Sequence, residues 1–344
     1  MREKTKVLVL RFSSIGDVVL TTPVLRCLKK IPGKEFEIHY ATKKKFAGIL
    51  KNNPHIHKIH TLDGKLSLLM RELKKENFDY IIDLHKNLRT ALVKLKLRKK
   101  SFTFPKINLQ KWLAVNLKKN MLPNVHIVDR YIFAANALGI KNDNLGLEYY
   151  FLPEVKNIKL DEYKNIFQSG YIGFVIGGMH STKKLPNEKI ASIIEKLNYP
   201  VILFGGKEDE ENGDEVVKIL NSKNVFNACG KHSLDESAFL VSNAKVIITH
   251  DTGLMHIAAA FYKPIVSVWG NTIPEFGMYP YMPGYENHSF ISEVEGLKCR
   301  PCSKIGHKKC PKKHFKCMME IDEEMIIDFC KTHIDKASDQ MILS

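Results

Sequence analysis

One stretch, residues 245–260, constrains the fold of this chain more than any other. Lys245–Thr249 is apolar and β-branched, which is typical of a short buried strand. Leu254–Phe261 is rich in alanine and leucine, which favours a helix, and His250–Gly253 is expected to form the turn between them. A strand that runs through a polar turn into a helix is half of a βαβ unit, so the stretch predicts a parallel α/β sheet.

The turn also predicts a ligand site, because open α/β sheets bind ligands at the carboxyl ends of their strands. The free backbone N–H groups of Thr252 and Gly253 would favour an anion, and Gly253 lets a phosphate approach without a Cβ in the way. Asp251 or Thr252 can cap the helix, and His256 falls about one turn further along. Taken alone, the turn is better explained as a plain helix cap followed by a surface histidine, because capping residues are common at helix starts.

The same alternation of strand and helix runs along the rest of the chain. In the first half, strands are expected at 7–12, 36–42, 56–62, 79–84 and 101–104, and helices at 18–30, 43–52, 66–76, 88–97, 109–119 and 125–138. In the second half, strands are expected at 171–176, 201–204 and 264–269, and helices at 186–197, 235–242, 320–332 and a stretch that ends near 220. Such alternation is typical of parallel, doubly wound sheets.

A length of 344 residues favours two domains rather than one. The alternation pauses in a mixed, polar segment at 139–170, which is where a domain boundary is expected. The sequence therefore predicts two Rossmann-like domains facing across a cleft, at 1–155 and 156–320, followed by a helix and tail at 320–344. The loop Ser13–Asp17 is similar to a phosphate cradle but lacks the P-loop ending, and there is no G-x-G-x-x-G fingerprint for a dinucleotide.

Basic residues are concentrated in the first half of the chain. Residues 1–150 contain 30 Lys and Arg against 12 Asp and Glu, a net charge of +18, and the remainder has 23 against 25, a net charge of −2. This asymmetry indicates a polyanionic partner such as a nucleic acid, an anionic membrane surface or a phosphorylated substrate, unless it is only a solvated face. A nucleic acid is the least expected of these, because the chain has no RNP-type aromatics and no finger or helix-turn-helix signature.

No apolar run is as long as a membrane span, and the start of the chain runs directly into a strand, so neither a signal peptide nor an anchor is expected. Seven cysteines, an odd number, favour reduced thiols in the cytoplasm. Four of them, Cys299, Cys302, Cys310 and Cys317, leave zinc open as an alternative. It is not the favoured expectation, because only the first pair has C-x-x-C spacing.

Four segments resemble the lipopolysaccharide heptosyltransferases, a family of inverting glycosyltransferases. In chain order they are Arg11–Pro23, Asp83–Thr90, His250–His256 and the cysteine-bearing segment at 299–318. The resemblance implies the two-domain GT-B fold and transfer of a heptose from ADP-heptose to the inner core of lipopolysaccharide. It also implies an anionic glycolipid acceptor at the inner face of a membrane. Together with the net charge of +18 in the first half, this predicts a cytoplasmic protein that associates peripherally with that face.

On the acceptor side, the resemblance makes Asp17 the general base. An inverting transfer needs one carboxylate to take the proton of the acceptor hydroxyl while the bond from sugar to phosphate breaks on the opposite side. Ser13, Ser14 and Gly16 lie in the same motif, and Arg89 lies in the second matching segment, so all four are expected near the acceptor. The alternative is that Asp17 only caps its helix.

On the donor side, Lys183 matches the phosphate-binding lysine of the family, and Lys184 is next to it. A lysine there would neutralise the leaving diphosphate as a metal ion does elsewhere, and the chain has no Asp-x-Asp pair, so no metal is expected. Asp209, or Glu208 beside it, matches a carboxylate for the ribose hydroxyls, with a helix-start acid as the alternative. The other expected donor contacts are Ser181 and Thr182, whose surroundings depart from the family pattern, and Asp251, Thr252, Gly253 and His256.

Two other functions stay open. A transferase of the same fold would use another nucleotide sugar or another surface polysaccharide as acceptor. A basic protein without enzymatic activity would bind nucleic acid, and a salt-sensitive gel shift would reveal it.

Overall fold

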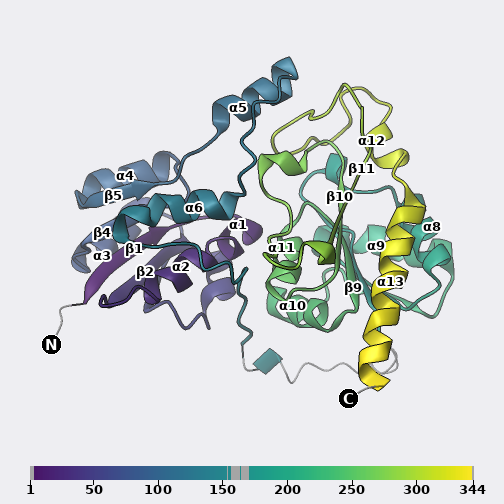
Figure 1. Ribbon diagram of the computed structural model, residues 1–344, viewed down its shortest axis with the longest axis horizontal. Coiled ribbons are helices and arrows are strands. Elements are labelled where there is room, and N and C mark those ends of the chain that lie inside the picture. Colours follow the sequence, from purple (N-terminus) through teal and green to yellow (C-terminus); the bar gives the residue numbers. More distant parts are fainter. Residues whose placement is uncertain (1–3, 153, 156–162, 164–169, 343–344) are drawn as a thin grey trace. The chain divides into compact units, whose positions relative to one another are not determined.

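The computed structural model describes residues 4–152, 154–155, 163 and 170–342 (Figure 1). The chain divides into two compact units, unit 1 with residues 1–106 and 125–152, and unit 2 with residues 107–124 and 153–344. Each unit is built around one parallel sheet, as the alternation of strands and helices predicts. The expected domain boundary after residue 155 adjoins residues 156–162, which lie outside the described part of the chain.

The sheet of unit 1 has the strand order β3-β2-β1-β4-β5. These strands are β1 (Thr5–Leu10), β2 (Phe36–Lys43), β3 (Lys58–Leu62), β4 (Tyr80–Asp83) and β5 (Lys100–Thr103), and every neighbouring pair is parallel. The order reverses between β1 and β4. The loops that follow these two strands therefore flank the position where doubly wound sheets bind ligands.

Helices cover both faces of this sheet. Helices α3 (Leu66–Lys75) and α4 (Leu88–Leu97) pack on one face, and α2 (Thr22–Lys29) and α6 (Ile127–Ala135) pack on the other. Leu8 and Leu10 of β1 belong to the core cluster under α3 and α4. Val7 and Val9, which point to the opposite face, are equally buried. Burial on both faces explains why β1 is a continuous apolar run rather than an alternating one.

Three segments of the first half differ from the sequence-based expectation. The helix expected over 18–30 is broken into α1 (Ile15–Val19) and α2, because the Thr21 hydroxyl bonds back to the carbonyl of Val18 and Pro23 lacks the N–H that would continue the ladder. The segment at 43–52 forms the 3₁₀-helix η1 (Lys44–Leu50). The segment at 109–119 forms α5 (Asn108–Trp112) and a π-helical turn, η2 (Leu113–Leu117).

The sheet of unit 2 has the order β11-β10-β9-β6-β7-β8. Its strands are β6 (Ile172–Val175), β7 (Val201–Phe204), β8 (Val225–Asn227), β9 (Val246–His250), β10 (Ile265–Trp269) and β11 (Ser289–Glu293). The sequence did not predict the two edge strands β8 and β11, which are short and only partly apolar. His250, expected in a turn, is the last residue of β9 and pairs with Val268. Here the order reverses between β6 and β9.

The longer helices of unit 2 pack on both faces of this second sheet. Helices α8 (Asn187–Leu197), α9 (Glu210–Leu220) and α13 (Glu323–Ile342) cover one face, and α10 (Leu234–Asn243) and α11 (Gly253–Ala260) cover the other. Figure 1 shows α13, in yellow, as a long helix beside the sheet, and it contacts α8. It begins at Glu323, three residues later than expected, and Pro186 precedes α8 as its N-cap rather than opening it.

Residues 107–124 precede α6 in the chain but pack with unit 2. Ala114 joins Ile273 and Phe276 in a small apolar cluster, and Lys118 donates hydrogen bonds to the carbonyls of Cys299 and Pro301. None of the described helices is long and apolar enough to cross a membrane.

Candidate functional site

In unit 1, polar residues gather where β1 and β4 end. Asp17 lies in the first turn of α1, where its Oδ2 accepts hydrogen bonds from the backbone N–H of Ser14 at 3.0 Å and from the Ser14 hydroxyl at 2.8 Å. Its Oδ1 forms an ion pair with Nη2 of Arg11 at 2.5 Å. Asp17 is thus fixed on two sides, and its side chain remains partly accessible, with 16% of its surface exposed.

Arg11 connects this carboxylate to the sheet. Its guanidinium donates to the carbonyl of Leu84 at 2.5 Å, to the hydroxyl of Tyr131 at 2.9 Å and to the carbonyl of Ser13 at 2.7 Å. Sequence reasoning placed Arg11 in the matching motif but gave it no role. Its signal was an arginine directly after an apolar strand, where a buried cation needs anionic and carbonyl partners.

The ion pair determines the charge state of the site. Burial alone would raise the pKa of Asp17, but the charge of Arg11 and the hydrogen bonds from Ser14 outweigh it, so the pKa of Asp17 is lowered. Burial would likewise lower the pKa of Arg11, and the charge of Asp17 reverses that effect. Asp17 is therefore a carboxylate at neutral pH and can accept a proton.

Two further groups that sequence reasoning missed lie beside this pair. Nδ1 of His85 is 3.3 Å from the backbone nitrogen of Phe12, and burial together with the charge of Arg11 lowers the pKa of His85 to about 4. Lys106 donates to the carbonyl of Lys86 at 2.8 Å, and burial, followed by the charge of Arg11, lowers its pKa. The site thus combines the Asp17 carboxylate with a neutral imidazole and two basic groups, which suits an anionic acceptor.

The other residues expected on the acceptor side lie at the same edge of the sheet. Ser13, Ser14 and Gly16 form the loop and the start of α1 around Asp17. Arg89 lies on the first turn of α4, after β4, and is exposed. The structure therefore brings the first three together with Asp17 and leaves Arg89 on the surface of the neighbouring loop and helix.

In unit 2, the loops after β6 and β9 are joined by a charged pair. Lys183, at the end of the 3₁₀-turn η6 (Ser181–Lys183), donates its ammonium to Oδ2 of Asp251, which directly follows β9. The hydroxyl of Thr272, after β10, donates to the same oxygen at 3.3 Å. Lysine and aspartate therefore meet at the point where the strand order of unit 2 reverses, which is the position predicted for the donor.

The two hydroxyl residues of η6 lie in different environments. Ser181 is exposed, whereas Thr182 is buried and bonds to the backbone of His307. The Thr182 hydroxyl donates to the carbonyl of His307 at 3.0 Å and accepts from its N–H at 2.8 Å. Thr182 therefore holds the cysteine-bearing segment against the loop after β6, a contact that the sequence did not indicate.

Asp209 is buried and connects the loop after β6 to the loop after β7 by hydrogen bonds. Its Oδ1 accepts from Lys184 at 2.9 Å, and its Oδ2 accepts from the backbone N–H of Gly206 at 3.0 Å. Gly177 has to be a glycine here, because a Cβ on it would lie 2.5 Å from Oδ2 of Asp209. Glu208, the alternative partner for a ribose, is exposed beside it. Contact of either carboxylate with a ribose stays a prediction.

The start of α11 has the arrangement that the sequence predicts. Thr252 is its N-cap and Gly253 its first residue, with the Thr252 hydroxyl 3.2 Å from that of Thr249. His256 is buried, so its description as a surface histidine is wrong. Nε2 of His250 accepts from the backbone N–H of Leu185 at 3.0 Å, and burial lowers the pKa of His250 to about 4, which leaves this ring neutral.

Asn271 is a further candidate that sequence reasoning missed. It follows β10, the neighbour of β9, and only 2% of its surface is exposed. Among the residues that the structure describes, neither its side-chain oxygen nor its nitrogen has a hydrogen-bond partner. Leaving a buried amide unpaired is costly, so Asn271 is suited to a ligand that offers both a donor and an acceptor. Its signal was a Gly-Asn-Thr run at a strand end.

Cys299, Cys302, Cys310 and Cys317 are free thiols. The first two line a hollow of about 540 Å³ together with Lys118 and His314. The Cys302 thiol donates to the carbonyl of Cys299 at 3.1 Å, and burial together with the Cys299 thiol raises the pKa of Cys302 to about 11. Within the described part of the chain, the groups of three potential metal ligands whose atoms lie within 4.8 Å of one another come from unit 1 and include none of these cysteines.

Comparisons with known proteins add to this geometry. The model of glycosyltransferase family 9 (heptosyltransferase) matches residues 67–314. Lipopolysaccharide heptosyltransferase 1 of Campylobacter coli is 27% identical over 352 residues, which cover 95% of this chain and 98% of that protein. Lipooligosaccharide heptosyltransferase 2 of Campylobacter jejuni subsp. jejuni serotype O:2 is 26% identical over 340 residues, covering 92% and 94%. The structure of Escherichia coli ADP-heptose lipopolysaccharide heptosyltransferase II shares the fold, with a TM-score of 0.74, 20% identity and coverage of 97% of this chain and 100% of that one.

Proposed function

Because this chain belongs to glycosyltransferase family 9, the heptosyltransferases, we propose that it transfers a heptose from ADP-heptose to the inner core of lipopolysaccharide. The observation that carries the proposal is Asp17, an ionised and partly exposed carboxylate held at the carboxyl edge of a doubly wound sheet by Arg11 and Ser14. Full-length similarity to two heptosyltransferases supports the choice of sugar.

In the proposed reaction, Asp17 takes the proton of the acceptor hydroxyl as its oxygen attacks the anomeric carbon of the heptose. The bond from that carbon to the diphosphate breaks on the opposite side, so the configuration inverts and ADP leaves. The low pKa of Asp17 means that it acts as a weak base, which accepts the proton late, when the new bond has already made the hydroxyl acidic.

We assign the donor to the β6 and β9 loops of unit 2. Lys183 would neutralise the charge that develops on the leaving diphosphate, and the backbone N–H groups at the start of α11, from Thr252 and Gly253, would bind its oxygens. The side-chain oxygen and nitrogen of Asn271, which have no hydrogen-bond partner among the described residues, would both bind the donor. This arrangement supports a transfer that needs no divalent metal at the diphosphate.

The test is a transfer assay on the purified full chain with ADP-heptose and a panel of truncated lipopolysaccharide cores. We expect ADP release and a product heavier by one heptose residue with a single member of the panel. The panel is needed because the relatives named for the first and second heptosyltransferase are 27% and 26% identical, which does not separate them. Transfer from a different nucleotide sugar, with none from ADP-heptose, would favour the alternative transferase instead.

We further propose that unit 1 associates peripherally with an anionic membrane surface at the cytoplasmic face. Helix α4 exposes Leu88, Leu92 and Leu95, with exposed fractions of 77%, 42% and 72%, at the i, i+4, i+7 spacing of one helix face. Arg89 and Lys96 lie exposed among them. A basic helix with exposed leucines can lie in the headgroup region of a bilayer. Leu97 packs against the core of unit 1, so it takes no part in this surface.

Vesicle co-sedimentation tests this proposal. Each basic residue near an anionic leaflet contributes about 1 kcal/mol, so replacing Lys96, Lys99 and Lys100 by glutamate should abolish most binding to anionic vesicles. Binding of the parent should fall steeply with salt, because exposed charges are screened over about 8 Å at physiological ionic strength. The matched control places glutamate at three exposed lysines of unit 2, namely Lys218, Lys223 and Lys231. Equal binding of the parent to neutral and anionic vesicles would contradict the proposal.

A further inference from the structure

A row of imidazole and carboxylate groups lies in unit 1, at the opposite ends of the strands from Asp17. Glu37 and His39 are two residues apart near the amino end of β2, so they share one face of the sheet. His60 lies on the neighbouring β3. Glu72 lies toward the end of α3, where the helix returns to the amino ends of the strands. The assigned reaction uses none of these groups.

His39 occupies the middle of the row and uses both of its ring nitrogens. Its Nε2 lies 2.9 Å from Oε1 of Glu37, and its Nδ1 lies 2.8 Å from Nε2 of His60. Nδ1 of His60 lies 2.5 Å from Oε1 of Glu72. Both rings are buried, and they are stacked with their centroids 5.1 Å apart, while the edge of Phe78 packs against them. The two rings are therefore held in one orientation.

Two neutral imidazoles have too few N–H groups to make every short contact in this row a hydrogen bond. Three short contacts join the four groups, and two neutral imidazoles carry one N–H each, which makes two. If His60 donates to Glu72 and His39 donates to His60, Nε2 of His39 presents a lone pair to the carboxylate of Glu37 at 2.9 Å. Two acceptors at that distance repel each other unless a proton or a metal ion lies between them.

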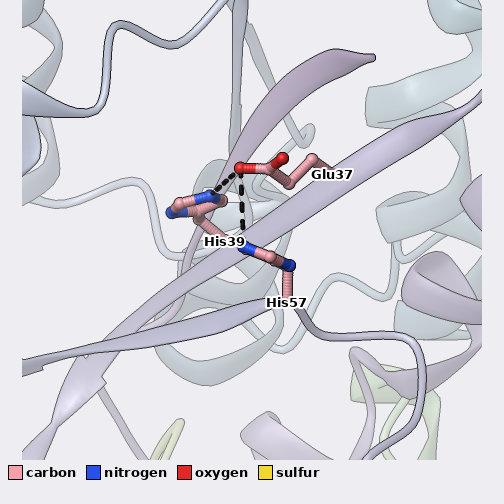
Figure 2. A group of neighbouring side chains, drawn as sticks. All are labelled: Glu37, His39 and His57. Carbon is pink, nitrogen blue, oxygen red and sulfur yellow. Dashed lines mark hydrogen bonds and ion pairs between the residues drawn. The ribbon is translucent and has the colours of Figure 1, made fainter.

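A third ligand lies at the same oxygen. Figure 2 shows Oε1 of Glu37 facing a ring nitrogen of His39 and a ring nitrogen of His57. Nε2 of His57 is 3.7 Å from this oxygen, and the backbone N–H of His57 is anchored on the carbonyl of Ile38 at 2.8 Å. We propose that Glu37, His39 and His57 form a binding site for a divalent transition-metal ion, with zinc as the best-fitting ion.

Zinc suits both the ligands and their spacing. Two imidazoles and one carboxylate form a recognised zinc set, and tetrahedral bonds of about 2.0–2.1 Å place neighbouring ligand atoms about 3.3 Å apart. The observed separations of 2.9 and 3.7 Å from Glu37 Oε1 bracket that value. His57 is 58% exposed, which gives the ion an entry path and leaves the fourth position to water. Because the site lies at the amino ends of the strands, its effect would be on stability rather than on the reaction.

The remainder of the row has the form of an outer shell. A metal-bound histidine usually donates its other N–H to a carboxylate, a backbone carbonyl or water, and this fixes the ring. Here a second imidazole, itself bonded to a carboxylate, takes that place. His39 would donate to His60, and His60 would donate to Glu72. The overlapping set of His39, His60 and Glu76 is a poorer site, because binding there would take the nitrogens that join the two rings, and Glu76 is already paired with Lys58 at 2.5 Å.

Lys6 offers a specific test of the proposal. Its ammonium nitrogen lies 3.2 Å from Oε1 of Glu37 and would compete with a metal ion for that oxygen. Removing this cation by Lys6→Gln should therefore tighten zinc binding. Removing Glu37 by Glu37→Gln should weaken it. A purely structural cluster of hydrogen bonds would lose stability in both variants and would not show opposite changes in metal affinity.

The test is a zinc titration of the metal-stripped full chain against a chromophoric chelator. We expect one equivalent of zinc to bind, and His57→Ala, at an exposed position, to weaken that binding by at least about 100-fold. Glu72→Gln, which changes only the outer shell, should weaken it about 10–100-fold. Zinc should also raise the unfolding temperature of the parent but not of His57→Ala, because an ion that binds only the folded state stabilises it.

Two comparisons separate this site from other sources of zinc binding. His55→Ala makes the same change two residues away, at a histidine paired with Glu148 rather than Glu37, and should leave the affinity unchanged. Replacing Cys299 and Cys302 by serine should also leave it unchanged, and the cobalt-substituted parent should lack a thiolate-to-cobalt charge-transfer band. Binding that survives in both His57→Ala and Glu37→Gln, or that is lost with the cysteines, would overturn the proposal.

Discussion

Asp17→Asn is expected to lower kcat by about 10²–10⁴-fold while leaving the affinity for ADP-heptose nearly unchanged. The amide has almost the same shape as the carboxylate and can still accept the hydrogen bonds of Ser14, but it cannot take the proton of the acceptor hydroxyl. The donor is assigned to other residues, so its binding should not change. Steady-state kinetics with donor and acceptor varied separately would measure both effects.

Ser14→Ala is the control for a role of Asp17 in the fold alone. It removes the hydroxyl contact of 2.8 Å at the start of α1 but keeps the carboxylate and its ion pair with Arg11, so it should retain far more of kcat than Asp17→Asn. If Asp17→Asn keeps activity within a few-fold of the parent, Asp17 is only part of the helix cap and another group must take the proton.

The same carboxylate should set the acid limb of the pH profile. A base works in its deprotonated form, and the pKa of Asp17 is lowered, so activity should persist to lower pH than an ordinary aspartate would allow. It should then fall as the pH drops through that lowered pKa. The charge of Arg11 lowers the pKa of Asp17. Arg11→Met should therefore raise that pKa and move the acid limb to higher pH, provided that the variant folds.

Lys183→Ala is expected to weaken ADP binding by about 1.5–3 kcal/mol, the range for a hydrogen bond to a charged group, which corresponds to about 10–150-fold in Kd. Lys183 is the cation at the β6–β9 reversal in unit 2, and its partner Asp251 is an anion. Without the lysine, that carboxylate would face the diphosphate unneutralised, so the loss should lie toward the upper part of the range. Calorimetric titration with ADP would measure it.

A double-mutant cycle with Asp251→Asn separates the two contributions. The double variant should recover the part of the loss that comes from repulsion by Asp251, but not the part that comes from the missing contact with phosphate. Lys231→Ala, at an exposed lysine of the same unit, is the control and should bind ADP like the parent. An unchanged Kd in Lys183→Ala would show that the lysine serves only to hold Asp251.

The proposal that the transfer needs no divalent metal is tested in the transfer assay with ADP-heptose. Brief treatment with a chelator should leave kcat unchanged, since Lys183 and the start of α11 are assigned the neutralising role. Loss of activity that magnesium or manganese restores would contradict that assignment. Zinc at the proposed site of Glu37, His39 and His57 should leave kcat unchanged, because that site lies at the other ends of the strands.

The sequence by itself determined the elements and their type, because these depend on local patterns. Continuous apolar runs such as Val7–Leu10 and Val246–Thr249 indicate strands that are buried on both faces. Polar residues in the loops and helix starts that follow such runs, among them Asp17, Asp251 and Thr252, are expected near the carboxyl ends of the strands whatever the strand order. Their place on a ligand-binding edge could therefore be predicted, and so could the doubly wound class of the fold.

Tertiary structure decided which strand ends lie side by side within each sheet. Neither the reversal between β1 and β4 nor that between β6 and β9 can be read from a local pattern, because strand order depends on pairing between distant segments. The contact of Arg11 with the carbonyl of Leu84 joins residues 73 positions apart, and it shapes the environment of Asp17. The buried amide of Asn271 and the membership of residues 107–124 in unit 2 were hidden for the same reason.

The row at Glu37 and His39 shows this division most clearly. Alternation along β2 places both side chains on one face, and that much follows from the sequence. Only the packing of β3 beside β2, and of α3 across them, brings His57, His60 and Glu72 to the same point. Local sequence sets the direction of each side chain, whereas burial and hydrogen bonding among distant segments decide which side chains meet, because those energies exist only once the chain is folded.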